Sequence, residues 1–337
     1  MSVKHRERLE KLKQNSLNDS KSKAISPVKH FSRDQSFLLG RGSGGTFVYL
    51  GLMEDGSEVA IKTMLLQPPP ETAENEKNIL SLIQTKNSRF VVNYRHYFRD
   101  ETFVYLVTDL CEETLKDHVL SRSIDDLKKK GRRMIKEILT GLQFLHDQGI
   151  LHRDLKPSNV LVDIGGHMRL ADFGISRVLK ADETTVYTNA KGTPGWMPAE
   201  IIEAIGQKVE SRYKKKSDIQ VTGMIAFFIL TKGDHPFGPT HDRMGNIVKG
   251  KPVNLKVLND KSARKFVKKL ICHKIKKRPY ACEALQYSYL NEAKDDDDDE
   301  DDDDDDDNDD VFHFRNINMR NLSIEDYFLN LLVEEHN

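Results

Sequence analysis

The sequence of 337 residues predicts an α+β fold with two lobes, a small β-rich lobe carrying one main helix and a larger helical lobe. Short apolar runs separated by glycine-rich breaks recur over residues 36–109, which is typical of consecutive antiparallel strands. Beyond Cys111 the apolar residues recur at helical spacing instead. We therefore expect a folded region at 31–294, divided into lobes at 31–110 and 111–294.

The elements of the small lobe can be placed one by one. Strands are expected at Ser36–Leu39, Phe47–Leu52, Val59–Met64, Val91–Phe98 and Phe103–Asp109. Asp55–Gly56 predicts a hairpin turn, because an Asp-Gly pair accepts the left-handed backbone that such turns need. Prolines 68–70 exclude strand and helix, and the main helix is expected directly after them at Glu71–Gln84.

The larger lobe is expected to consist mostly of helices. They are predicted at Thr114–Leu120, Lys129–Asp147, Ser217–Thr231, Ser262–Ile271 and Cys282–Tyr289. Short strands are expected around Leu161 and Leu170.

Charge is segregated along the chain. Residues 1–30 carry eight Lys or Arg against three acids and show little periodicity, which predicts a mostly disordered basic arm with at most a short helix around Arg6–Lys13. Residues 295–310 hold fifteen acids in sixteen positions, and since the whole chain has a net charge of −1, the remainder carries +14. This acidic block is interpreted either as a solvated tail or as a mask over lysines of the larger lobe and a handle for basic partners. Residues 311–337 are expected to be a tail with a short helix at Ile324–Val333.

The cellular compartment follows from cysteine usage and hydropathy. Three cysteines without a CxxC pair predict neither a disulfide framework nor a zinc site, and they fit a reducing compartment. The charged N-terminus has no apolar signal segment, and the longest apolar run, Ile219–Leu230, is about half of a membrane span. We expect a soluble chain in the cytoplasm, with the nucleus as the alternative.

Two motifs in the small lobe suggest phosphate binding. The pattern GxGxxG is formed by Gly40, Gly42 and Gly45. A dinucleotide-binding fold would begin a helix at the third glycine, whereas Thr46–Leu50 predicts a strand, so the pattern favours a hairpin over nucleotide phosphates. Lys62 ends the string VAIK on a half-buried strand, where its ammonium can neutralise phosphate charge. It needs a carboxylate to orient it, for which Glu76 is favoured over Glu74.

The string HRDLKPSN at 152–159 carries the strongest signal. Asp154 can accept or orient the proton of an attacking hydroxyl, and Lys156 can neutralise a transferring phosphoryl group. Asn159 and Asp172, the latter in the string DFG, supply hard oxygen ligands that suit Mg²⁺. A basic polar loop would explain each residue singly but not the set.

In this order the motifs resemble the eukaryotic protein kinase family over residues 35–292. The resemblance implies a two-lobed kinase fold with ATP in the cleft and transfer of its γ-phosphoryl group to protein hydroxyls in the presence of Mg²⁺. The lysine in HRDLKPSN is the serine/threonine form, so protein substrates carrying these hydroxyls are expected.

The resemblance also implies the contacts of the adenine ring. The hinge at Asp109–Cys111 is expected to bond the ring through its backbone, with Thr108 at the entrance to a deeper pocket. The apolar contacts are expected from Phe47, Ala60 and Leu161.

The segment from Asp172 to Glu200 holds several hydroxyls. A phosphate next to Arg153 would order this segment, and its candidate carriers are Thr184, Thr185 and Thr188. Thr193 is expected to contact Asp154 and Lys156 instead of receiving phosphate.

Three landmarks follow in the larger lobe. Asp218 is expected to anchor the loop that carries HRDLKPSN, and Glu200 is expected to pair with Arg278. The family's usual Ala-Pro-Glu appears as Pro198-Ala199-Glu200, which perturbs the neighbouring substrate-docking geometry without indicating a dead enzyme.

A narrower resemblance is to the kinase half of the inositol-requiring enzyme and ribonuclease L group, carried by LGRGSGGTFVYLG, FVYLVTDLCEETL, LHRDLKPSNVLV and GTPGWMPAE. It implies a back-to-back homodimer. Only 43 residues follow Lys294, so we expect no nuclease domain of the usual size and no nucleic-acid substrate. The alternatives to an active kinase are a nucleotide-gated dimerising scaffold and a remnant of a kinase/endoribonuclease.

Overall fold

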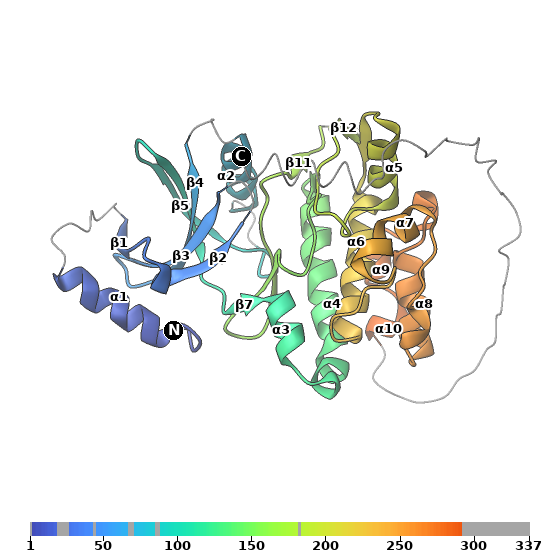
Figure 1. Cartoon of the computed structure of the whole chain (residues 1–337), viewed down its shortest axis with the longest axis horizontal. Helices are drawn as coiled ribbons and strands as arrows, with labels where there is room; N and C mark the ends of the chain where they lie inside the picture. The colour runs from blue at the N-terminus through green and yellow to red at the C-terminus, as the bar shows by residue number, and fades with distance from the viewer. Residues whose placement is uncertain are drawn as a thin grey trace, which may run out of the picture. The chain divides into compact units, whose positions relative to one another are not determined.

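The computed structural model describes residues 2–18, 27–42, 45–66, 71–84, 88–180 and 183–291. Within these residues the predicted two-lobed α+β fold is confirmed, because a β-rich region precedes a larger, mainly helical one (Figure 1). The acidic block at 295–310 and the predicted helix at Ile324–Val333 lie outside the described residues.

The small lobe is built on one antiparallel sheet in the strand order β1-β3-β4-β6-β5, with β2 paired to β3. Its strands are β1 (Val28–Phe31), β2 (Leu38–Arg41), β3 (Phe47–Met53), β4 (Glu58–Leu65), β5 (Tyr94–Arg99) and β6 (Phe103–Asp109). Its helices are α1 (Arg6–Asn18), the 3-10 helix η1 (Gln35–Phe37) and α2 (Glu71–Gln84). The chain leaves this sheet after Asp109, which is where the sequence places the junction of the lobes.

The hairpin between β3 and β4 turns at the predicted Asp-Gly pair. Gly56 adopts a φ of +83°, and Asp55 Oδ1 accepts the Ser57 N–H at 2.8 Å. Along β4, Val59 and Ile61 are buried, so the alternation of a strand places Ala60 and Lys62 together on the opposite face.

The large lobe is mainly helical. Its helices are α3 (Leu115–Ser121), α4 (Ile124–Asp147), α5 (Ala199–Gln207), α6 (Lys215–Leu230), α7 (Thr240–Val248), α8 (Lys261–Leu270), α9 (Ala281–Ala284), α10 (Ser288–Asn291) and the 3-10 helices η2 (Leu255–Val257) and η3 (Ile275–Lys277). Its short strands are β7 (Glu113–Thr114), β8 (Ile150–Leu151), β9 (Val160–Val162), β10 (Met168–Leu170), β11 (Arg177–Val178), β12 (Val186–Thr188) and β13 (Ser211–Tyr213). Helices α4 and α6 lie against each other in the middle of the lobe (Figure 1).

Two of the predicted helices differ from the structure by more than two residues. Helix α4 begins at Ile124 instead of Lys129, because the Ser123 hydroxyl caps it by accepting the Asp126 N–H at 3.2 Å. The predicted helix Cys282–Tyr289 is divided into α9 and α10, since the chain between them makes tight turns such as the Gln286 N–H to Glu283 carbonyl bond of 3.1 Å. Helices α5 and α7 are additional to the sequence prediction.

The predicted disordered arm is a further correction. The described part of residues 1–30 contains α1, which is longer than the expected helix around Arg6–Lys13, and β1, which joins the sheet. Leu9 and Leu12 of α1 are buried in a cluster with Phe37, Leu50 and Leu52. The described part of the arm is therefore ordered by contacts with residues distant in sequence, which its weak periodicity does not reveal.

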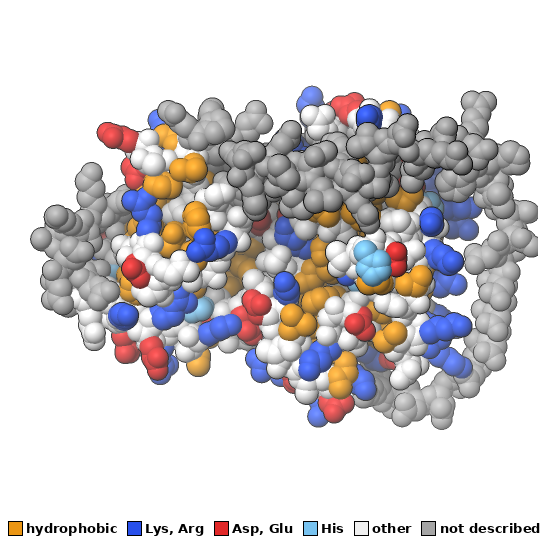
Figure 2. Space-filling model, in the orientation of Figure 1, with side chains coloured by type: hydrophobic (Ala, Val, Ile, Leu, Met, Phe, Trp, Pro, Cys, Tyr) orange, Lys and Arg blue, Asp and Glu red, His pale blue; other side chains and the backbone are white. Residues whose placement is uncertain are grey.

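The surface of the large lobe carries much of the basic charge. Lys and Arg side chains gather over α8 (Figure 2), whose exposed residues include Lys265, Lys268 and Lys269. Among the described residues, no helix combines the length and apolarity needed to cross a membrane.

Candidate active site

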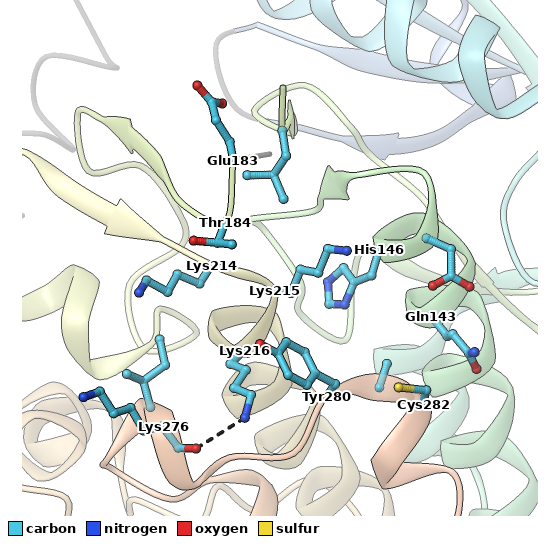
Figure 3. A pocket seen from close by; sticks show the side chains of 14 residues that line it. Gln143, His146, Glu183, Thr184, Lys214, Lys215, Lys216, Lys276, Tyr280 and Cys282 are labelled. Atoms are coloured by element: carbon cyan, nitrogen blue, oxygen red, sulfur yellow. Dashed lines mark hydrogen bonds between the residues drawn. The ribbon is translucent and has the colours of Figure 1, made fainter. Parts of the chain in front are cut away.

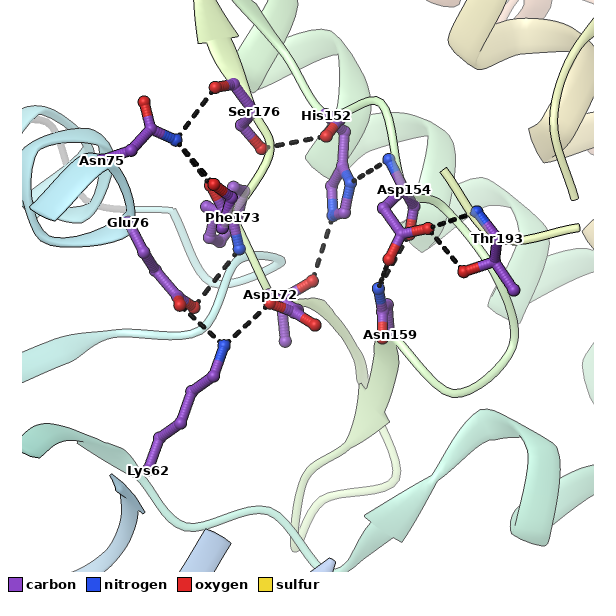
Figure 4. Close-up of polar contacts among 12 residues, drawn as sticks. Lys62, Asn75, Glu76, His152, Asp154, Asn159, Asp172, Phe173, Ser176 and Thr193 are labelled. Carbon is purple, nitrogen blue, oxygen red and sulfur yellow. Dashed lines mark hydrogen bonds and ion pairs between the residues drawn. The ribbon is translucent and has the colours of Figure 1, made fainter. Parts of the chain in front are cut away.

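Lys62 lies at the centre of an ion-pair network that joins the two lobes (Figure 4). Its Nζ lies 2.7 Å from Oε2 of Glu76 on α2 and 2.8 Å from Oδ1 of Asp172. Glu76 is 3% exposed, whereas Glu74 is exposed and lies 3.5 Å from Lys77. Of the two glutamates that the sequence offers, Glu76 is therefore the one positioned to orient Lys62.

Burial and charge act in opposite directions on this network. Burial lowers the pKa of Lys62, but attraction to Asp172 and Glu76 outweighs it and raises the pKa above its ordinary value. Burial raises the pKa of Asp172, but attraction to Lys62 outweighs it and lowers the pKa to about 2. For Glu76 burial dominates and raises the pKa despite Lys62. Lys62 and Asp172 are therefore charged at neutral pH.

Asn75 ties α2 to the segment that follows Asp172. Its Nδ2 donates to the carbonyl oxygens of Phe173, Gly174 and Ser176 at 3.1, 3.0 and 3.0 Å. Asn75 is not among the site residues predicted from the sequence. Its position directly before Glu76 is the feature of the sequence that could have indicated it. Glu76 adds a second tie, because its Oε1 accepts the Phe173 N–H at 3.3 Å.

Asp218 at the start of α6 anchors the loop that carries HRDLKPSN, as the sequence predicts. It is fully buried, and its carboxylate accepts the backbone N–H groups of His152 and Arg153, each at 3.0 Å. The Tyr213 hydroxyl donates to the same carboxylate at 2.9 Å. Arg153 has a φ of 70°, which costs a residue other than glycine of the order of 1–3 kcal/mol. The buried carboxylate therefore holds a strained backbone in place.

Asp154, Asn159 and Thr193 lie close together (Figure 4), and Lys156 joins them through its ammonium group. Asp154 Oδ1 accepts the Thr193 hydroxyl at 2.7 Å and its N–H at 3.1 Å. Asp154 Oδ2 accepts from Lys156 Nζ at 2.8 Å and from Asn159 Nδ2 at 2.9 Å. Lys156 Nζ also donates to the Thr193 hydroxyl at 2.5 Å.

Asn159 and Asp172 suit a magnesium ion by their chemistry. Asn159 Nδ2 donates to the backbone carbonyl of Asp154 at 2.8 Å as well as to its carboxylate, so Oδ1 is the amide atom left for a metal. Asp172 contributes a carboxylate that is ionised at neutral pH. Magnesium retains several waters and is commonly held by one or two carboxylate or carbonyl side chains, so this donor set fits it.

The glycine pattern forms a hairpin, as the sequence predicts. Gly40 of β2 pairs with Val48 of β3, and the Gly42 N–H donates to the Thr46 carbonyl at 2.8 Å. Gly45 has a φ of +71°, which favours glycine. No helix begins there, which argues against a dinucleotide-binding turn.

The residues assigned to the adenine site lie on three elements. Phe47 begins β3, Ala60 lies on β4 and Leu161 lies on β9. Asp109 at the hinge turns its carboxylate to Arg95 and Asn93, at 2.5 and 2.8 Å, and its N–H donates to the Asn93 carbonyl at 3.1 Å. The Asp109 group left for a ligand is therefore its backbone carbonyl.

Cys111 is the other hinge residue, and it is buried. Burial raises the pKa of its thiol to about 12, so the side chain remains neutral and behaves as an apolar group. Its backbone groups, rather than its sulfur, are what it offers a ligand.

Glu200 and Arg278 form the predicted pair. Arg278 is fully buried, and its NH1 and NH2 donate to Glu200 Oε1 and Oε2 at 3.0 and 2.8 Å. The inverted order Pro198-Ala199 is accommodated, because the Ala199 N–H donates to Oε1 of the buried Gln220 at 2.9 Å.

The phosphate site expected beside Arg153 stays a prediction. Arg153 is 2% exposed, and its guanidinium donates to the carbonyl oxygens of Ile175 and Asn189 at 3.0 and 3.4 Å. A separate pocket of 590 Å³ is lined instead by Thr184 and by Lys214–Lys216 (Figure 3).

The fold and this constellation define a protein kinase, and comparison with known proteins agrees. Residues 34–290 match the family described as protein kinase domain, so the chain belongs to the protein kinase family. Its similar proteins place it on the serine/threonine side of that family.

Two groups of relatives are informative. The probable serine/threonine-protein kinase irlD of Dictyostelium discoideum is 34% identical over 66% of this chain and 16% of its own length. The serine/threonine-protein kinase/endoribonuclease IRE2 of Homo sapiens is 30% identical over 70% of this chain and 26% of its own length. IRE1 of Oryza sativa subsp. japonica is 30% identical over 62% of this chain and 25% of its own length. The chain thus resembles the inositol-requiring group and spans about a quarter or less of these relatives.

Proposed function

We propose that this chain is an ATP- and Mg²⁺-dependent serine/threonine kinase that transfers the γ-phosphoryl group of ATP to protein hydroxyls. The observation that carries the proposal is the environment of the Thr193 hydroxyl. This hydroxyl donates to the Asp154 carboxylate at 2.7 Å, and its oxygen accepts from Lys156 Nζ. A substrate hydroxyl in the place of Thr193 would meet the same two groups.

Each residue of the site then has its own role in the phosphoryl transfer. Asp154 orients the substrate hydroxyl and accepts its proton as the oxygen bonds to the γ-phosphorus, while the bond from that phosphorus to the β–γ bridging oxygen breaks and ADP leaves. Lys62, fixed by Glu76, neutralises charge on the α- and β-phosphates, and Lys156 neutralises it on the transferring group. Asn159 and Asp172 would hold Mg²⁺, which supplies charge neutralisation along the phosphates.

The test is phosphate transfer from labelled ATP to a generic basic protein by the full chain and two variants. Asp154→Asn should lower kcat by roughly 10²–10⁴ and leave nucleotide binding intact. Glu74→Gln is the matched control, because it removes the rejected glutamate and should leave kcat unchanged. Near-normal turnover by Asp154→Asn would refute the mechanism, whereas a wild-type chain that binds ATP without turning over would favour the scaffold alternative.

We further propose that the kinase phosphorylates its own activation segment at Thr184. Strands β12 and β13 pair Val186 with Tyr213, and the chain continues from Tyr213 through Lys214 into helix α6. Thr184 lines the pocket together with Lys214–Lys216 (Figure 3).

The charge of this pocket supports an anion there. Lys214–Lys216 lie at the start of α6, where the helix dipole disfavours cations, and no ion pair among the described residues involves Lys214 or Lys215. Glu183 and Asp147 also line the pocket but leave an excess of positive charge. A phosphate on Thr184 would compensate both effects.

Mass spectrometry after incubation with Mg²⁺ and ATP tests this assignment. Phosphate should accumulate on Thr184, and phosphorylation should raise the melting temperature of the wild-type chain but not of Lys214→Ala/Lys215→Ala. Thr185→Ala is the control, since Thr185 does not line the pocket. Phosphorylation confined to Thr185 or Thr188 would contradict the proposal.

A further inference from the structure

We propose that residues 2–12, which we term the N-terminal clamp, are a positioning element for the nucleotide site. The clamp binds the outer side of the hinge and the root of the glycine hairpin at the same time. This inference rests on the ATP site proposed above and goes beyond it, because it assigns a role in nucleotide affinity to a segment that touches no reacting atom.

The first part of the clamp binds residues that directly follow the hinge. Glu112 accepts the Val3 N–H at 3.1 Å and the Lys4 N–H at 2.8 Å with its two carboxylate oxygens. His5 Nε2 lies 3.1 Å from the Glu112 carbonyl, and Lys4 Nζ lies 2.9 Å from Glu113 Oε2. The Glu112 carboxylate thus accepts two successive backbone N–H groups, which fix its orientation and stabilise its negative charge.

Glu112 and Glu113 belong to the large lobe through their own backbone. The Glu112 N–H donates to the Val162 carbonyl at 2.8 Å, and Glu113 pairs with Val162 across the β7–β9 ladder. Strand β9 also carries Leu161, which is assigned to the adenine site. The clamp is therefore bonded to the floor side of that site through a short, hydrogen-bonded path.

The second part of the clamp binds the small lobe. The Ser2 N–H donates to Glu58 Oε2 of β4 at 2.5 Å. Arg8 donates from Nε to the Ser36 carbonyl and from NH2 to the Leu38 carbonyl, each at 2.9 Å. Leu38 begins β2, the strand that enters the glycine hairpin, so the guanidinium holds the root of that hairpin.

A shared apolar cluster completes the connection. Leu9 and Leu12 of the clamp are 3% and 0% exposed, and Leu39 of β2 and Leu110 of the hinge pack against the same cluster. Leu39 directly precedes Gly40. Because interiors are densely packed, the hinge and the hairpin root cannot move apart without opening this cluster or breaking the polar contacts on both sides.

The clamp therefore favours one separation of the lobes and so raises affinity for the nucleotide between them. Coupling of this kind is reciprocal: nucleotide must strengthen the clamp by the factor by which the clamp strengthens nucleotide binding. A segment that only added stability would change the melting temperature and leave nucleotide affinity alone. The two roles can thus be separated by measurement.

The experiment compares Arg8→Ala and Glu112→Ala with Arg6→Ala in the full chain, since Arg6 is an exposed arginine on the same helix. We expect the Kd of a non-hydrolysable ATP analogue, measured by calorimetry, and the KM for ATP to rise about 5- to 20-fold in the first two variants and to stay constant in the control. The kcat at saturating ATP should change by less than about twofold. Glu112→Gln, which keeps one acceptor oxygen, should show a smaller rise.

Hydrogen exchange supplies the reciprocal measurement in the wild-type chain. The analogue should slow exchange at the amides of Leu9 and Leu12, and this protection should disappear in Arg8→Ala. Kd values within about twofold of the wild type in both clamp variants, with lowered melting temperatures, would overturn the proposal and leave a structural segment. A wild-type chain that binds no ATP analogue would refute the proposed function and the clamp with it.

Discussion

Replacing Glu200 by Gln tests the buried ion pair that fixes the end of the activation segment. Arg278 is 0% exposed and places NH1 and NH2 on the two Glu200 oxygens, while Nε donates to the Cys272 carbonyl at 2.6 Å. Removing the negative charge leaves a buried guanidinium without its counter-charge, which costs about 3–5 kcal/mol. At about 2–4 °C per kcal/mol for a domain of this size, the melting temperature should fall by about 6–20 °C.

The matched control is Glu203→Gln on the same helix. Its carboxylate is 38% exposed and lies 3.7 Å from His273, a surface contact worth at most about 1 kcal/mol. Both proteins would be unfolded in urea and by heat, with phosphate transfer measured on the folded fraction. A Glu200→Gln variant no less stable than the Glu203→Gln control would refute the reasoning, because the buried charge would then be compensated elsewhere.

Three further outcomes are expected. Burial lowers the pKa of His235 well below its ordinary value of 6.5, so the unfolded chain takes up a proton there that the folded chain refuses. The unfolding free energy should therefore fall as the pH drops below 6.5. In urea unfolding between pH 5 and 7, His235→Phe should reduce the slope of unfolding free energy against pH by up to about 1.4 kcal/mol per pH unit. An unchanged slope would contradict the assignment. Thr108→Met should weaken the binding of bulky ATP-site inhibitors at least about tenfold in competition assays while ATP turnover persists, because Thr108 pairs with Ala60 beside the adenine site. Equal inhibition of the variant and the wild type would mean that the strand register is misassigned. Deleting residues 295–310 should change the ratio of activities on acidic and basic peptides at low salt but not at high salt, where the screening length falls to a few ångströms. Equal ratios in the deletion variant and the wild type at every salt concentration would identify the acidic block as an inert tail.

The choice of Glu76 could be made from the sequence because helical periodicity constrains it. Ile79 and Leu80 mark the buried face of α2, and Glu76 falls on that face, whereas Glu74 falls outside it and is exposed in the structure. The loop at 152–159 could be predicted from the sequence as well, because its reacting groups lie at fixed spacings within eight residues. Local geometry decides both cases.

The clamp and Asn75 could not be predicted for the opposite reason. Glu112 receives the Lys4 N–H across 108 positions of sequence, and Asn75 reaches the Phe173 carbonyl across 98. Apart from Val3, the only apolar residues in 2–12 are Leu9 and Leu12, and one pair is too little periodicity to distinguish a docked helix from a solvated one. Their order depends on partners that only the folded sheet and hinge bring near.

The inverted Pro198-Ala199 pair shows how one local departure is absorbed by a distant side chain. In the family's usual order the proline would occupy the first helical position, where its missing N–H is no loss. Here Ala199 occupies that position and presents an N–H in the interior, which would remain unsatisfied without a partner. Gln220 of α6 accepts it at 2.9 Å and donates its own Nε2 to the Ile271 carbonyl at 3.3 Å. Because the donor is satisfied, α5 begins where Glu200 can still reach Arg278, and the exchange of two residues leaves the ion pair intact.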